Sequence, residues 1–244
     1  EKHIQLSKEC FAEGSPDLLL WPETALPDDI LQDRLLSEPI QRFVQEQQVD
    51  IILGSALLRN AQDMNSIVHF LKDGRAEVIY TKRKTIPLVE DQFVPGSRAG
   101  FVNLGDLVGG ILICSEDFYR QYFVEYQRKG VGFIVVPLND GWFTAPEALM
   151  LHLQASITHS VAFGLPIVRV ANTGISAFID PSEGLFLSEY PQYIDKQRVF
   201  LWDISLKRPK KTFYSKVGDI FPWVCILFVI MTILNKRIRN KNIL

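Results

Sequence analysis

Short, continuous apolar runs recur along this chain and limit the folds open to it. They lie at 18–21, 109–113, 131–138 and 167–171, and stretches with helical spacing separate several of them. Strands without polar alternation are typical of sheets that are covered on both faces. The order of the runs therefore predicts an α/β chain in which helices cover the sheets.

The remaining elements follow from periodicity and turn signals. Residues 1–14 have the pattern of an amphipathic helix, and Pro27-Asp28-Asp29 indicates the start of another that continues to about Gln47. Lys72-Asp73-Gly74-Arg75 predicts a tight turn between two strands. We expect further strands at 50–57, 66–71, 76–81 and 176–180, and further helices at 118–129 and 147–163.

Three chemically active residues stand in distinctive strings close to predicted strand ends. They are Glu23 in WPETA, Lys82 in YTKRKTIPLVE and Cys114 in ILICSED. A free thiol with a pKa of ~8.5 is mostly protonated at neutral pH, and a nearby carboxylate can take its proton as attack begins. An ammonium can then stabilise the tetrahedral oxyanion, by roughly 3 kcal/mol for a well-placed donor. The three side chains together would suffice for covalent acyl transfer.

Each of these residues also has a plain structural interpretation. Free cysteine is among the most buried residue types, so Cys114 alone fits a structural thiol. Glu23 alone fits a solvated carboxylate after a strand, and Lys82 fits one of three surface charges with Arg83 and Lys84. The occurrence of all three strings in one chain favours the catalytic interpretation.

The three strings resemble the catalytic motifs of the nitrilase, or carbon-nitrogen hydrolase, superfamily, and more narrowly those of the apolipoprotein N-acyltransferase family. The spacing from Lys82 to Ile86-Pro87 and Glu90 is similar to that family's lysine motif, which Lys84 would not fit. Ser115 stands where the family usually carries an aromatic residue, so the wall beside the nucleophile differs. Further similar strings are Cys114 with Glu116, Asn139-Asp140-Gly141-Trp142-Phe143, His152-Leu153-Gln154 and Leu165-Pro166-Ile167-Val168-Arg169.

The resemblance implies a nitrilase-like α-β-β-α sandwich with catalytic residues at strand ends. It implies Glu23 as the general base, Lys82 as the oxyanion stabiliser and Cys114 as the nucleophile. Glu90 and Glu116 become supporting carboxylates, for which a simple surface ion pair is the structural alternative.

The same resemblance implies a substrate and partners. Asn139, Trp142 and Phe143 are expected to border the substrate entrance, although Trp142 and Phe143 also fit ordinary core aromatics. The implied reaction moves an acyl chain from a phospholipid, through a cysteine thioester, to the N-terminal diacylglyceryl cysteine of a bacterial lipoprotein. It needs no cofactor or metal. The expected partners are the phospholipid donor, the apolipoprotein acceptor and a membrane, with the protein as a monomer.

An uncharged apolar run at 220–234 is followed by a basic segment. We predict a catalytic domain at 1–206, a linker at 207–219, a transmembrane helix at 220–235 and a basic cytoplasmic tail at 236–244. A buried core helix is the alternative, because fifteen helical residues span about 22 Å against a ~30 Å hydrocarbon core. By resemblance, we expect a bacterial inner-membrane protein with a periplasmic catalytic domain and with membrane spans upstream of Glu1.

Composition and charge exclude several other classes. The chain is 47% hydrophobic and 22% charged, as in an ordinary globular domain, and its net charge of -2 gives no basic footprint for nucleic acid. Cys10, Cys114 and Cys225 are too few and too widely spaced for a disulfide framework or a zinc site. His152 and His159 share a predicted helix without a third ligand, so they fit core or surface histidines.

Two other functions remain open from the sequence. One is an amidase or nitrilase that hydrolyses small C–N bonds with the same three side chains. The other is a membrane-tethered module that keeps the fold without catalysis. The apolar run at 220–234 weighs against the first, and the presence of Glu23, Lys82 and Cys114 weighs against the second.

Overall fold

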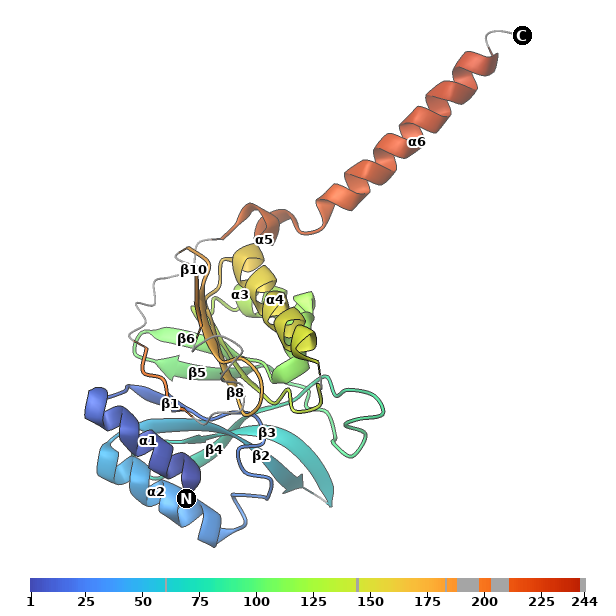
Figure 1. Cartoon of the computed structure of the whole chain (residues 1–244). Coiled ribbons are helices and arrows are strands. Elements are labelled where there is room, and N and C mark those ends of the chain that lie inside the picture. The colour runs from blue at the N-terminus through green and yellow to red at the C-terminus, as the bar shows by residue number, and fades with distance from the viewer. Residues whose placement is uncertain (60, 144, 183, 188–197, 203–210, 242–244) are drawn as a thin grey trace. The chain divides into compact units, whose positions relative to one another are not determined.

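A computed structural model describes residues 1–59, 61–143, 145–182, 184–187, 198–202 and 211–241 (Figure 1). It divides into two compact units, Glu1–Lys210 and Lys211–Leu244. The first unit holds both sheets and the helices that cover them. Residues 207–210 of the linker predicted at 207–219 lie outside the described residues. The rest of that linker contains the short helix α5 (Phe213–Val217).

The first sheet has four strands in the order β1-β2-β3-β4. Their bounds are β1 Leu18–Leu20, β2 Asp50–Arg59, β3 Gln62–Phe70 and β4 Ala76–Thr81. β1 pairs with β2 in parallel, and the other two pairings are antiparallel. Helices α1 (Lys2–Glu13) and α2 (Arg34–Gln47) cover this sheet, and Cys10, Phe43 and Val44 join its strands in one apolar core.

The second sheet has six strands in the order β10-β9-β8-β7-β6-β5. Their bounds are β5 Gly100–Leu104, β6 Leu107–Ile111, β7 Phe133–Leu138, β8 Ile167–Ala171, β9 Ala177–Asp180 and β10 Gly184–Leu187. The central pairs β6–β7 and β7–β8 are parallel, and the outer pairs are antiparallel. Every residue of β7 is buried, as its continuous apolar run predicts.

The layers of the first unit follow the predicted α-β-β-α order. Figure 1 shows α1 and α2 on the outer side of the first sheet, and α3 (Arg120–Arg128) and α4 (Pro146–Phe163) on the outer side of the second. The short 3-10 helix η1 (Cys114–Phe118) begins shortly after β6 and contacts β7 and α4. The prediction of a nitrilase-like α/β fold is therefore confirmed.

Two predicted details of the first unit are wrong. α2 begins at Arg34 rather than at Pro27, because Asp33 caps it by accepting the backbone N–H of Leu35 at 2.8 Å. Asp29 accepts hydrogen bonds from the backbone N–H groups of Leu31 and Leu58, so it ties a loop to β2 instead of opening a helix. Strands β5 and β10 were not predicted, since β5 has a polar residue within it and β10 offers only three apolar residues after a glycine turn.

The second unit contains α5 and the helix α6 (Ile220–Lys241). α6 passes without a break through 235, so the predicted boundary between a span and a tail is not a structural boundary. Within the part of the chain that the structure describes, no helix combines the length and the apolarity that crossing a membrane requires. The transmembrane helix predicted at 220–235 is therefore not supported, and its apolar part is shorter than a hydrocarbon core.

Candidate active site

The three predicted site residues follow three different strands of the two sheets. Glu23 comes three residues after β1, Lys82 directly follows β4, and Cys114 begins η1 after β6. All three side chains are buried. The first sheet thus supplies the carboxylate and the ammonium, and the second supplies the thiol.

Lys82 lies between two buried carboxylates. Its Nζ is 3.2 Å from Glu23 Oε1 and 2.7 Å from Glu90 Oε1. Asn65, on β3, donates from its side-chain amide to the same Glu23 oxygen at 2.7 Å. The second Glu90 oxygen accepts the backbone N–H of Ile86 at 2.8 Å. Both carboxylates are therefore oriented by donors, and Glu90 is a direct partner of the lysine rather than part of a surface ion pair.

These contacts fix the charge of Lys82. Burial alone would lower the pKa of this ammonium, but Glu23, Cys114 and Glu90 outweigh it and raise the pKa above its usual value. Lys82 is therefore a cation at every physiological pH. Its side chain is 1% exposed, so this charge acts in a region that solvent screens weakly.

Cys114 stands in a strained turn at the start of η1. Its φ is +50°, a conformation that side chains other than glycine rarely adopt. Burial and the negative charge of Glu23 raise the pKa of its thiol well above the usual value; Lys82 and a hydrogen bond from the backbone N–H of Asn139 oppose this only in part. The resting thiol is therefore neutral, and attack requires a base.

Glu116 connects the segments that carry Lys82 and Cys114. One carboxylate oxygen accepts the backbone N–H groups of Arg83 and Lys84 at 2.7 and 3.0 Å. The other accepts the Tyr80 hydroxyl at 2.7 Å and the backbone N–H of Ile113 at 2.8 Å. Burial nevertheless raises the pKa of Glu116, and these four donors act against the shift. Glu116 is thus a tie between the two sheets and not a surface charge.

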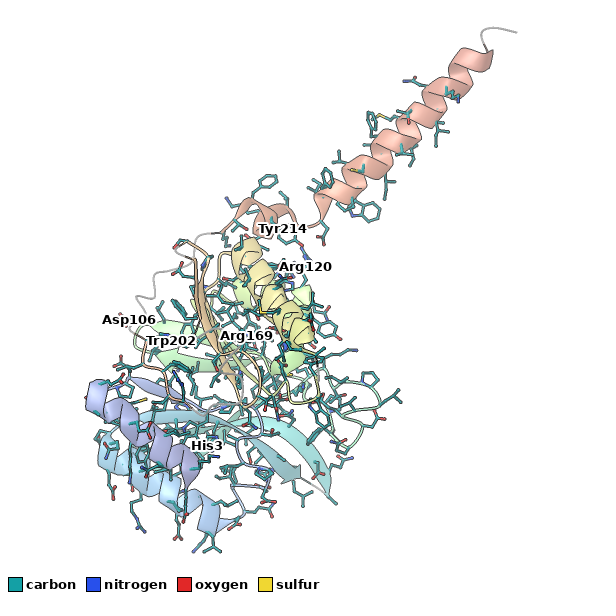
Figure 2. All side chains as sticks on the ribbon, in the orientation of Figure 1. His3, Asp106, Arg120, Arg169, Trp202 and Tyr214 are labelled. Atoms are coloured by element: carbon teal, nitrogen blue, oxygen red, sulfur yellow. The ribbon has the colours of Figure 1, made fainter. Side chains whose placement is uncertain are left out.

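A second group of buried charges lies behind Cys114, and the sequence did not predict it. His152, on α4, contacts Asp140 through Nδ1 at 2.7 Å and Asp117 through Nε2 at 2.9 Å. Arg169, on β8, donates to Asp117 at 2.6 Å. The Ser156 hydroxyl, on α4, donates to Asp117 and accepts a hydrogen bond from Arg169. Figure 2 labels Arg169 in the interior of the first unit.

The loop after β7 holds the predicted entrance residues. The Asn139 side-chain amide lies 3.4 Å from the Thr24 hydroxyl, beside Glu23. Trp142 is 68% exposed and Phe143 is 44% exposed, so neither is a core aromatic. Ser115 is half-buried next to Cys114. Their part in substrate binding stays a prediction.

The next feature is the set of side chains that could act as metal ligands. No cluster of three or more His, Cys, Asp or Glu side chains suited to a metal ion occurs in the described ranges. The chemistry available is a neutral thiol, a carboxylate base and a fixed ammonium. Such a set can form and resolve an acyl-enzyme by itself.

Comparisons with known proteins identify the family of this chain. Residues 1–207 match the family described as Carbon-nitrogen hydrolase. The chain is 27% identical over 244 residues to apolipoprotein N-acyltransferase of Geobacter metallireducens, an alignment that covers 91% of this chain and 46% of the relative. It is also 27% identical over 204 residues to the enzyme of that name from Thermotoga maritima, with 75% and 39% covered. The chain spans about half the length of these curated relatives.

Solved structures show the same fold at lower identity. A mutant of the nitrilase-superfamily amidase from Nesterenkonia AN1 matches with a TM-score of 0.62 at 15% identity, covering 76% of this chain and 79% of that one. Another structure of a Nesterenkonia amidase gives a TM-score of 0.61 at 16% identity, with 80% and 85% covered. At these identities the similarity establishes the architecture alone.

Proposed function

The chain belongs to the carbon-nitrogen hydrolase family, and from that premise we propose that it is the catalytic part of an apolipoprotein N-acyltransferase. Relatives of that name match along most of the chain. The observation that carries the proposal is the contact of Lys82 with Glu23 and Glu90, buried in the same site as a neutral Cys114 thiol. The proposed substrates are a phospholipid acyl donor and the N-terminal diacylglyceryl cysteine of a lipoprotein.

The first half of the proposed reaction forms an acyl-enzyme. Glu23 takes the proton of the Cys114 thiol as the sulfur attacks the ester carbonyl of the phospholipid. The Lys82 ammonium stabilises the oxyanion that forms. The C–O bond then breaks, Glu23 returns the proton to the departing alkoxide, and a lysophospholipid leaves behind a Cys114 thioester.

The second half transfers the acyl chain to nitrogen. The α-amine of the lipoprotein cysteine attacks the thioester carbonyl, and Glu23 accepts the amine proton. The C–S bond breaks as the amide forms, and the proton passes back to the Cys114 sulfur. Proton and charge are both restored, so the cycle needs no cofactor.

Location and substrate approach belong to the same proposal. The exposed aromatics Trp142 and Phe143 offer apolar contact for acyl chains beside the site. The apolar run at 220–234 with the basic residues that follow supports attachment to a bacterial inner membrane. A periplasmic catalytic domain belongs to the same proposal, because the resemblance to the apolipoprotein N-acyltransferase family implies it.

An amidase that acts on small soluble substrates is the second candidate. The similarity of the fold to the Nesterenkonia amidases favours it. Release of ammonia from acetamide or butyramide by the protein, abolished by Cys114→Ala, would identify this activity. Both candidates use Glu23, Lys82 and Cys114, so they differ in the acceptor and in the size of the entrance.

Intact mass spectrometry tests the proposal directly. We expect the full-length protein, incubated in detergent micelles with phospholipid, to gain the mass of one fatty acyl chain that hydroxylamine removes. Cys114→Ala should gain none. Cys225→Ser is the matched control, because Cys225 is exposed and lies in the second unit, and it should be acylated like the wild type. A wild-type protein that transfers acyl chains to lipoprotein without ever carrying one would refute the mechanism.

A further inference from the structure

His152 occupies a place that the proposed mechanism does not use. It is 1% exposed, and the ring contacts two buried carboxylates at once. Nδ1 faces Asp140 Oδ1 at 2.7 Å and Nε2 faces Asp117 Oδ1 at 2.9 Å. An ionised carboxylate only accepts hydrogen bonds, so both ring nitrogens must carry protons. The geometry therefore requires an imidazolium.

The two carboxylates belong to the two segments that meet at the nucleophile. Asp117 is in η1, the 3-10 helix that Cys114 begins. Asp140 lies two residues after β7, which contacts η1, and its neighbour Asn139 reaches the Thr24 hydroxyl beside Glu23. The same ring contacts a carboxylate from each of the two segments.

We propose that His152 is a positioning residue: a doubly protonated imidazole that joins Asp117 to Asp140 and so holds the loop after β7 against η1, the helix that Cys114 begins. This inference rests on the proposed role of Cys114 as the nucleophile. His152 itself touches neither the sulfur nor a substrate, and it acts through the two carboxylates.

Surrounding groups fix the ring in plane and in charge. Phe118 stacks on it at 4.8 Å between centroids, and Phe143 meets its edge at 6.4 Å. The charged groups around the ring are two anions, Asp117 on η1 and Asp140 after β7, and one cation, Arg169 on β8. With the imidazolium itself, the cluster holds two cations and two anions.

The balance of these effects keeps the ring charged. Burial and Arg169 would lower the pKa of His152, but the two aspartates raise it to about 9. The ring is therefore charged at neutral pH.

The loop that carries Asp140 depends on this anchor. The backbone N–H of Asp140 donates to the Thr173 carbonyl at 2.7 Å, and Gly174 approaches the Asp140 carboxylate so closely that an added Cβ would lie 2.8 Å from Oδ2. That Oδ2 has no hydrogen-bond partner within the described residues. Without His152 the Asp140 charge would stand uncompensated beside Cys114, and it already raises the pKa of the thiol.

Alkylation of Cys114 measures the proposed effect without any lipid. Iodoacetamide reacts with the thiolate, so the rate at pH 7, followed on the Cys114 peptide by mass spectrometry, falls tenfold for each unit by which the thiol pKa rises. We expect His152→Gln to slow the reaction at least tenfold and to shift its pH profile to higher pH. His159→Gln is the matched control: His159 lies on the same helix, stacks on Phe123 and should react within twofold of the wild type.

A second measurement uses the wild-type protein, so it tests the proposal even if His152→Gln does not fold. In the wild-type protein labelled with ¹⁵N-histidine, we expect His152 to show two downfield ring N–H protons at pH 7. One protonated nitrogen would overturn the inference, as would a folded His152→Gln that is alkylated at the wild-type rate. If alkylation behaves as expected but no lipid acyl-enzyme forms, the positioning role stands and the proposed acyltransferase function is refuted.

Discussion

Replacing Lys82 with methionine removes the one cation that Glu23 and Glu90 share. The two carboxylates lie 3.2 and 2.7 Å from the same nitrogen, and all three side chains are at most 8% exposed. Removing one partner of a buried ion pair typically costs about 3–5 kcal/mol, because the charge left behind has no compensation. For a unit of this size, each kcal/mol lowers Tm by about 2–4 °C. We therefore expect Lys82→Met to lower Tm by about 6–20 °C at pH 7.

The matched control is Lys84→Met, the same substitution two positions along. Lys84 is exposed, and its ammonium lies 5.9 Å from the Tyr119 ring, so this variant should lose less than about 1 kcal/mol. Thermal unfolding followed by circular dichroism compares the two.

A double variant isolates the interaction. Glu90→Gln in the Lys82→Met background should recover part of the stability, since it removes one of the two uncompensated charges. Equal stability of Lys82→Met and Lys84→Met at pH 7 would show that the ammonium is not held between the carboxylates. The assignment of Lys82 as the oxyanion stabiliser would then lose its structural basis.

Three further predictions follow from other contacts of the site. Glu116→Gln should lose at least about 3 kcal/mol in urea denaturation, because an amide cannot accept all four hydrogen bonds. Glu46→Gln, at an exposed position of α2, is the control and should lose under about 1 kcal/mol. Gly54→Ala should lower kcat about 100-fold with little change in KM, because the alanine Cβ would lie 2.7 Å from the Glu23 Cα and displace this carboxylate. An unchanged kcat would refute this prediction. The stability that the His152 charge contributes should be complete below pH 6.5 and lost as pH rises through about 9. The difference in unfolding free energy between the wild type and His152→Gln should therefore fall by about 3 kcal/mol across that range.

The sequence predicted a strand correctly wherever that strand is itself a continuous apolar run. β7 and β8 are continuous apolar runs, and the strands that precede Glu23, Lys82 and Cys114 were all predicted. β5 and β10 were missed because each is short and begins at a glycine, so its strand pairing depends on a neighbour that only the fold provides. α2 was placed too early because Asp29 resembles a first-turn acid, while its oxygens bond to β2.

The buried charges behind Cys114 had no comparable signal. His152 has the same appearance in the sequence as His159, yet one bridges two carboxylates and the other stacks between rings. Asp117 and His152 are 35 positions apart, and no local pattern relates such distant polar residues. An available hint was that Asp117 lies within the ILICSED string and that Asp140 lies two residues after a predicted buried strand. An unpaired acid is costly in such surroundings.

The charge balance of the site explains why a neutral thiol suits the proposed chemistry. At rest Glu23 and Glu90 share the Lys82 ammonium, and a thiolate would add a further negative charge to a weakly screened site, so burial and Glu23 keep the proton on Cys114. When that proton moves to Glu23, the net charge does not change, and Lys82 then lies among one carboxylate, a neutral acid and the new thiolate. The ammonium freed from Glu23 is the donor that a developing oxyanion requires. Proton transfer and oxyanion stabilisation are therefore coupled through the same lysine, and a base placed outside contact with Lys82 could not provide this coupling.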